Sequence, residues 1–149
     1  MAITEQTQAR LADVIDEQIR CAQAMLGALD LEDEALKAGD SERLNSAGAD
    51  KARLVESLED LEQERSGLAA VLELRLATLE DSDTGGKWRE LLAILEQCRQ
   101  RNQRNGALVR ARREQVLAAL RLLGGTESEL YDSKGFESVA RNAQRLGSA

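Results

Sequence analysis

Three long stretches of the chain, about residues 4–38, 41–79 and 87–123, carry apolar residues at steps of three and four positions. This spacing puts the apolar side chains on one face of an α-helix, which has 3.6 residues per turn. The sequence contains no proline, so no residue breaks a helix through a missing backbone N–H. The pattern therefore predicts three long helices that pack through their apolar faces.

The composition favours helix packing over a β-sandwich. Hydrophobic residues make up 42% of the chain, but aromatic residues only 2%, and small aliphatic side chains suit close contacts between helices. A charged share of 32% is typical of long helices and coiled coils. We expect an all-α fold: an antiparallel bundle of three long helices with coiled-coil-like packing, residues 1–125, followed by a tail, residues 126–149.

Short polar and glycine-containing segments mark the expected helix ends. Serine, threonine and aspartate cap helix N-termini, and glycine adopts the left-handed conformation that ends a helix. The segment 81–86 begins like a calcium loop, but its twelfth position is Leu92, where a bidentate glutamate is required, so we interpret it as a turn. The expected caps and terminators are Thr4, Gly39, Asp40 or Ser41, and Gly124 with Gly125.

The second stretch has the most regular seam. Its apolar positions alternate steps of three and four, the heptad spacing of a left-handed coiled coil. Lys51, Arg65 and Arg75 occupy seam positions. They disfavour a symmetric homodimer zipper and suit a bundle, in which their long stems lie across the edge of the core. The apolar seam positions are Leu44, Ala47, Leu54, Leu58, Leu61, Leu68, Leu72 and Leu79.

Two asparagines interrupt the apolar face of the third stretch. Asn102 and Asn105 share that face and Gly106 follows them; helical periodicity on both sides predicts that the helix continues through them. A buried amide without a partner costs about 1–3 kcal/mol. The asparagines therefore form either a polar layer that fixes helix register, which the spacing favours, or the lining of a peptide groove.

Charge is distributed unevenly. Residues 1–86 hold 8 basic and 20 acidic residues, a net of −12, and residues 87–149 hold 12 and 7, a net of +5; together they give −7. Seven arginines lie between Arg99 and Arg121, against one acid, Glu114. We expect these arginines to pair with the acidic second helix. Nucleic-acid binding is disfavoured because no aromatic residues are interleaved for base stacking, and binding of an acidic protein is a further alternative.

The sequence lacks the usual residues of an active site. It has no histidine, the commonest general base and metal ligand. Cys21 and Cys98 stand far apart without metal-ligand spacing. We therefore expect no enzymatic activity, no cofactor and no metal. The N-terminus is polar and no apolar run is long enough to cross a bilayer, so we expect a cytoplasmic protein without membrane insertion.

The tail carries its own amphipathic pattern. Thr126 with Glu129 is typical of a capping box. A short helix after it would carry one apolar stripe, and about a dozen residues are marginally stable as an isolated helix. Two interpretations remain: the tail folds back on the bundle, or it docks on a partner. The stripe consists of Phe136, Val139, Ala143 and Leu146.

Three motifs in a fixed order then point to a family. Asn102-x-x-Asn105-Gly106 lies in an Arg-rich helix, followed by Leu120-x-x-Leu123-Gly124 and Leu130-Tyr131-x-x-x-Gly135. This arrangement resembles the FlgN-type flagellar export chaperones. The resemblance implies a chaperone that binds the C-terminal helical region of hook-associated proteins, keeps them unassembled and delivers them to the gate of the type III export apparatus.

The resemblance also implies roles for single residues. Tyr131 would dock on the cytoplasmic domain of the export gate, and Gly135 would form the turn after it. Asn102, Asn105 and Gly106 are motif positions without an assigned role. The alternative to the chaperone is a self-associating coiled-coil structural or adaptor protein, such as a homodimer, without a secretion role. The expected partner-binding residues are Leu120, Leu123, Leu130, Tyr131, Gly135, Phe136, Val139, Ala143 and Leu146.

Overall fold

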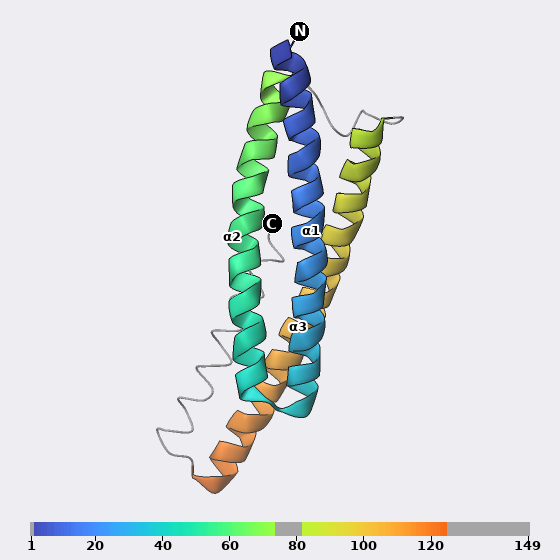
Figure 1. The fold of residues 1–149 in the computed structure, drawn as a ribbon. Helices are drawn as coiled ribbons and strands as arrows, with labels where there is room; N and C mark the ends of the chain where they lie inside the picture. The colour runs from blue at the N-terminus through green and yellow to red at the C-terminus, as the bar shows by residue number, and fades with distance from the viewer. Residues whose placement is uncertain (1, 74–81, 125–149) are drawn as a thin grey trace. The chain divides into compact units, whose positions relative to one another are not determined.

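The computed structural model describes residues 2–73 and 82–124. Within these ranges the protein has three α-helices and no β-strand: α1 (Ala2–Ala38), α2 (Ser41–Val71) and α3 (Asp83–Leu123) (Figure 1). The prediction of an all-α protein with three long helices is confirmed. The short C-terminal helix predicted within residues 126–149 lies outside the described residues.

The junction between α1 and α2 forms as predicted. Gly39 has a φ of +67° and ends α1 in the left-handed conformation. The carboxylate of Asp40 then accepts a hydrogen bond of 3.1 Å from the backbone N–H of Arg43, which is the N-cap interaction. A connection of two residues forces α2 to return along α1, so the two helices form an antiparallel hairpin.

Three predicted helix ends are wrong. α1 begins at Ala2, so Thr4 lies inside the helix and is not its cap. α2 ends at Val71 rather than at residue 79, because Glu73 takes a φ of +53°. α3 begins at Asp83 and contains residues predicted to be a loop. Its start is explained by Ser82, whose hydroxyl accepts a hydrogen bond of 3.0 Å from the N–H of Gly85.

The chain divides into two compact units, and each of the three helices contributes to both. Unit 1 consists of Met1–Gly27 and Arg53–Cys98. Its core is aliphatic, as the composition predicts, and Trp88 packs at its margin. The buried residues are Leu11, Ile15, Ile19, Ala22 and Leu91, with Leu68, Leu72, Trp88, Ile94 and Leu95 packed against them.

Polar contacts fasten the surface of unit 1. Arg10 of α1 binds Glu64 of α2 through two hydrogen bonds of 2.6 and 2.9 Å. The guanidinium of Arg65 lies 4.5 Å from the centre of the Trp88 ring, a cation–π contact between α2 and α3. Arg65 therefore lies at the edge of the core, as predicted for a basic residue on the seam.

Unit 2 consists of Ala28–Ala52 and Arg99–Ala149, described as far as Gly124. Its aliphatic core is small and comprises Ala35, Leu36, Leu44 and Val109. Asn105 of α3 contacts the carbonyl of Leu29, and Arg112 contacts the carbonyl of Leu36. Both contacts join residues 76 positions apart, so in this unit α3 runs parallel to α1 and antiparallel to α2.

The end of α3 projects past the α1–α2 turn of unit 2 (Figure 1). Because contacting residues of α1 and α3 are 76 positions apart in sequence, residue 114 lies level with Ala38, the last residue of α1. From there α3 continues for nine more residues to Leu123. Gly124, with a φ of +68°, follows the helix, as predicted for its terminator. The projecting segment leads directly into residues 125–149.

Candidate functional site: a buried polar layer and the exposed end of α3

Lys51 of α2 lies at the centre of a polar layer in unit 2. Its side chain is 1% exposed, and so is that of Glu32 of α1. The ammonium group donates to both carboxylate oxygens of Glu32, at 3.0 Å each, and to Oδ1 of Asn102 of α3, at 2.8 Å. These three acceptors match the three protons of an ammonium group. One lysine thus joins all three helices.

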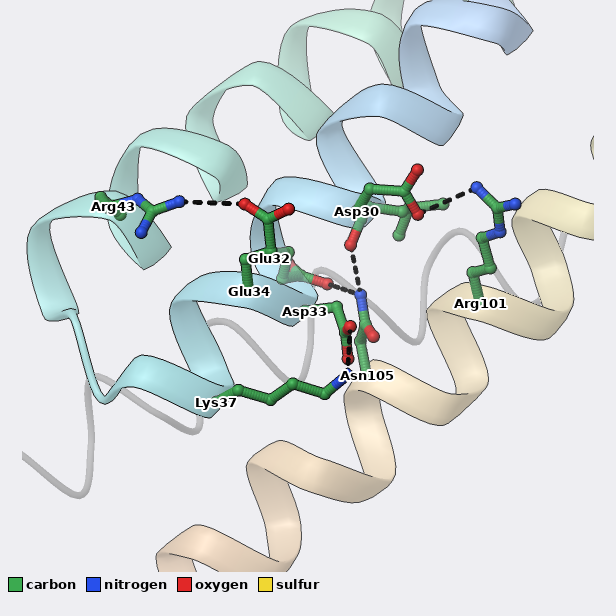
Figure 2. Close-up of polar contacts among 9 residues, drawn as sticks. Asp30, Glu32, Asp33, Glu34, Lys37, Arg43, Arg101 and Asn105 are labelled. Carbon is green, nitrogen blue, oxygen red and sulfur yellow. Dashed lines mark hydrogen bonds and ion pairs between the residues drawn. The ribbon is translucent and has the colours of Figure 1, made fainter.

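Asn105 extends the layer by one helical turn along α3. Its amide nitrogen donates to the backbone carbonyl of Leu29 (2.9 Å) and to Oε1 of Glu32 (3.1 Å), as Figure 2 shows. Both partners are acceptors, so the orientation of the amide is fixed by chemistry: the flipped amide would bring oxygen against oxygen. The Oδ1 atom of Asn105 is buried and accepts no hydrogen bond within the described residues.

The layer makes unit 2 less stable than its number of contacts suggests. Burial lowers the pKa of Lys51, because the charged ammonium loses its hydration, and the adjacent Glu32 carboxylate opposes this change only in part. Replacement of a buried ion pair by apolar residues of similar volume is often neutral or stabilising by about 1–4 kcal/mol. A polar layer at this position is therefore better explained by specificity than by stability.

Partly exposed ion pairs lie near Glu32 and Asn105 of the layer (Figure 2). Arg101 of α3 binds Asp30 of α1 at 2.9 Å, and Arg43 of α2 binds Glu34 of α1 at 3.1 Å. In unit 1, Lys87 of α3 likewise binds Asp16 of α1 at 3.0 Å. Arg101 and Lys87 of α3 thus pair with acids of α1, and the pairing with α2 that we predicted for the arginines between Arg99 and Arg121 stays a prediction for the others. Solvent-exposed pairs of this kind contribute about 0–1 kcal/mol each.

The sequence-predicted site residues fall into three groups. Asn102 and Asn105 are 2% and 0% exposed and belong to the layer, and Gly106 is buried within α3. Leu120 is half-buried on the projecting end of α3, where Leu123 is 81% exposed. The remaining predicted partner-binding residues, Leu130, Tyr131, Gly135, Phe136, Val139, Ala143 and Leu146, lie outside the described residues.

Sequence reasoning missed Glu32 and misjudged Lys51. We predicted that the stem of Lys51 would lie across the core edge. The whole side chain is buried instead, because Glu32 and Asn102 accept hydrogen bonds from its ammonium group. The available signal was the spacing of Glu32, which lies three residues after Leu29 and four before Leu36. That spacing puts an acid on the same apolar face as the buried leucines, opposite a lysine on the seam of α2.

The described part of the chain contains no group of three or more His, Cys, Asp or Glu side chains placed to hold a metal ion. None of its helices is long and apolar enough to cross a bilayer.

The described residues thus define a protein of three long helices with a buried polar layer and a helix end that exposes Leu122 and Leu123. The family model described as FlgN protein matches residues 1–138. The chain therefore belongs to the FlgN family and is a FlgN-type flagellar export chaperone; this family is one of chaperones rather than enzymes. No curated protein and no solved structure is significantly similar to it.

Proposed function

We propose that this chaperone acts in the cytoplasm, binds the C-terminal helical region of hook-associated proteins and delivers them to the export gate. The family match carries the proposal, since it extends through residue 138 and so includes the Tyr131 motif. Residues 1–125 serve as the helical bundle and residues 126–149 as the docking tail. Tyr131 contacts the gate, and Gly135 allows the turn that follows it.

The exposed end of α3 supports the proposed division into a helical bundle and a docking tail. Leu122 and Leu123 are 88% and 81% exposed, although a soluble protein gains by covering adjacent large apolar side chains. Leu120 lies one helical turn before Leu123 on the same helix. Together with the apolar stripe of the tail, these residues offer an amphipathic surface of the kind that binds a partner helix.

Calorimetric titration with C-terminal peptides of hook-associated proteins tests client binding. We expect saturable one-to-one binding to the full chain with a negative heat-capacity change, because apolar surface is buried. A chain ending at residue 125 is expected to keep the helical circular dichroism of the bundle and to lose the binding. Unchanged affinity of the truncated chain would refute the assignment of the tail.

A matched pair of substitutions separates gate docking from client binding. Tyr131→Ala is expected to abolish capture by the gate's cytoplasmic domain while the peptide affinity stays the same, and Tyr131→Phe reports on the hydroxyl alone. If the full chain binds no peptide and light scattering shows a tight oligomer across a dilution series, the self-associating coiled-coil alternative replaces the chaperone proposal. A homodimer that still binds the peptide is compatible with it.

A further inference from the structure

We propose that the buried polar layer of Glu32, Lys51, Asn102 and Asn105 is a register lock. It fixes how far α3 is advanced along the α1–α2 hairpin in unit 2. The layer connects all three helices through side chains that are at most 2% exposed. Its function is to exclude the neighbouring alignments of α3.

Only α3 is free to choose a register. The two-residue turn at Gly39 and Asp40 fixes α2 against α1. The connection from α2 to α3, residues 72–82, has eleven residues. Eleven residues span at most about 36–40 Å, whereas a slip of one heptad moves a helix by about 10 Å. By its length alone, this connection constrains the register of α3 less than the two-residue turn constrains that of α2.

An advance of α3 by one heptad would change which residues meet the polar layer. Positions one heptad before the asparagines hold Leu95 and Cys98, so an advance of α3 by seven residues would bring these two against the charges of Lys51 and Glu32. The same advance would bring Thr84 to the position of the buried Leu91 and Asn102 to that of the buried Val109. The ammonium and the carboxylate would also lose every amide partner in a site closed to water.

The opposite slip is disfavoured as well. It would bring Val109 and Arg112 to the positions of Asn102 and Asn105. Arg112 would then take the position of Asn105, which contacts Glu32, so two cations would share one carboxylate in a poorly solvated site, and Val109 would replace the amide that accepts from Lys51. Neither slip reproduces the hydrogen bonds that the observed register makes from Lys51 and Asn105. The polar contacts at this level of the bundle thus favour the observed alignment.

The register determines the position of the projecting helix end. In the observed register α3 extends nine residues past the level of Ala38, and a slip of one heptad would nearly double or nearly abolish this extension. The lock therefore sets where Leu122 and Leu123 are exposed and where residues 125–149 begin. The importance of that position for docking rests on the proposed function; the lock itself does not.

Distance measurements between two spin labels test the lock without any client. Labels are attached at Ser41→Cys and Arg121→Cys, two exposed positions of unit 2, in a chain carrying Cys21→Ala and Cys98→Ser. This reference is expected to give one narrow distance distribution. In the apolar-layer variant, Glu32→Met, Lys51→Met, Asn102→Leu and Asn105→Leu are added, and we expect a second population displaced by up to about 10 Å.

Two further variants complete the experiment. Gln103→Leu with Arg104→Leu places two leucines on the exposed side of the same helical turn and is expected to keep the single distribution. The moved-layer variant, Leu95→Asn, Cys98→Asn, Asn102→Leu and Asn105→Ala, is expected to lengthen the main distance by up to about 10 Å, because α3 advances by one heptad.

The outcomes separate the lock from a merely stabilising network. A single unchanged distribution in the apolar-layer variant overturns the proposal, and so does an unchanged main distance in a moved-layer variant that keeps its helical circular dichroism. If the moved-layer variant unfolds, the apolar-layer variant decides. Unfolding of the apolar-layer variant also contradicts the lock, because a layer kept for register is not required for folding. None of these results depends on client binding.

Discussion

Substitution of Lys51 by methionine removes the charge at the centre of the polar layer and keeps most of the side-chain volume. The Glu32 carboxylate, 1% exposed, then retains only the amide of Asn105 as a described partner. Breaking a buried ion pair from one side costs about 3–5 kcal/mol. In a domain of about 150 residues each kcal/mol lowers Tm by about 2–4 °C. We therefore expect Tm to fall by about 6–20 °C.

A second substitution is expected to reverse most of this loss. Adding Glu32→Met to Lys51→Met removes the stranded carboxylate, and apolar replacement of a buried pair is neutral or stabilising by about 1–4 kcal/mol. The double variant should thus be at least about as stable as the original chain. Arg43→Met, which breaks the exposed pair with Glu34, is the matched control and is expected to cost less than about 1 kcal/mol.

Urea denaturation followed by circular dichroism gives the free energies of unfolding for this comparison. The original chain, the single variants Lys51→Met and Glu32→Met, and the double variant form a double-mutant cycle in which the coupling energy isolates the pair. The reasoning fails if Lys51→Met is as mild as Arg43→Met, because the ammonium would then be solvated. It also fails if Glu32→Met in the Lys51→Met background restores nothing, because the loss would then come from packing.

Two further predictions concern the turn and the pH dependence. Gly39→Ala is expected to lower the free energy of unfolding by about 1–2 kcal/mol, because alanine is strained at a φ of +67°; urea midpoints measure this, and an unchanged midpoint would contradict it. Hydrogen bonds from Arg65, and secondarily from Gln18, lower the pKa of Glu62 below its ordinary 4.5, although burial opposes this. The resulting stability is fully present above pH 4.5 and is lost as the pH falls through the lower folded-state pKa. Glu62→Gln should therefore weaken acid destabilisation, measured by the emission of Trp88; parallel pH profiles would disprove it.

The number and rough extent of the helices were predictable because apolar spacing and the absence of proline act locally. Gly39 and Asp40 were predictable for the same reason, since a left-handed glycine and an N-cap depend on neighbouring residues only. The end of α2 was not, because Leu72 and Leu79 continue the apolar spacing while the backbone turns at Glu73. Hydrophobic spacing reports which face is buried, not where the backbone leaves the helix.

The polar layer was only half predictable. Asn102 and Asn105 stand out because amides interrupt an apolar face, and the burial of both fits the layer interpretation that the spacing favoured. Glu32 and Lys51 did not stand out, because charged residues are almost never fully buried unless paired. Pairing is a property of two helices at once, and it depends on which levels of α1 and α2 meet. A single sequence shows the two charged residues but not which levels of the two helices face each other.

The two units differ in what holds their described helices together. Unit 1 contains the larger aliphatic core, where Leu, Ile and Trp side chains are buried through contacts without a preferred direction. Unit 2 has a smaller aliphatic core, including Ala35 and Val109. It also contains the Lys51 ammonium group, which donates three hydrogen bonds to Glu32 and Asn102. A buried ion pair stabilises a fold less than an apolar layer of similar volume does. Directional hydrogen bonds between three helices, however, form in one alignment of the helices. The projecting end of α3 begins two to three turns beyond that layer. The polar layer at Lys51 therefore lowers the stability of unit 2 slightly and fixes the position of the surface that exposes Leu122 and Leu123.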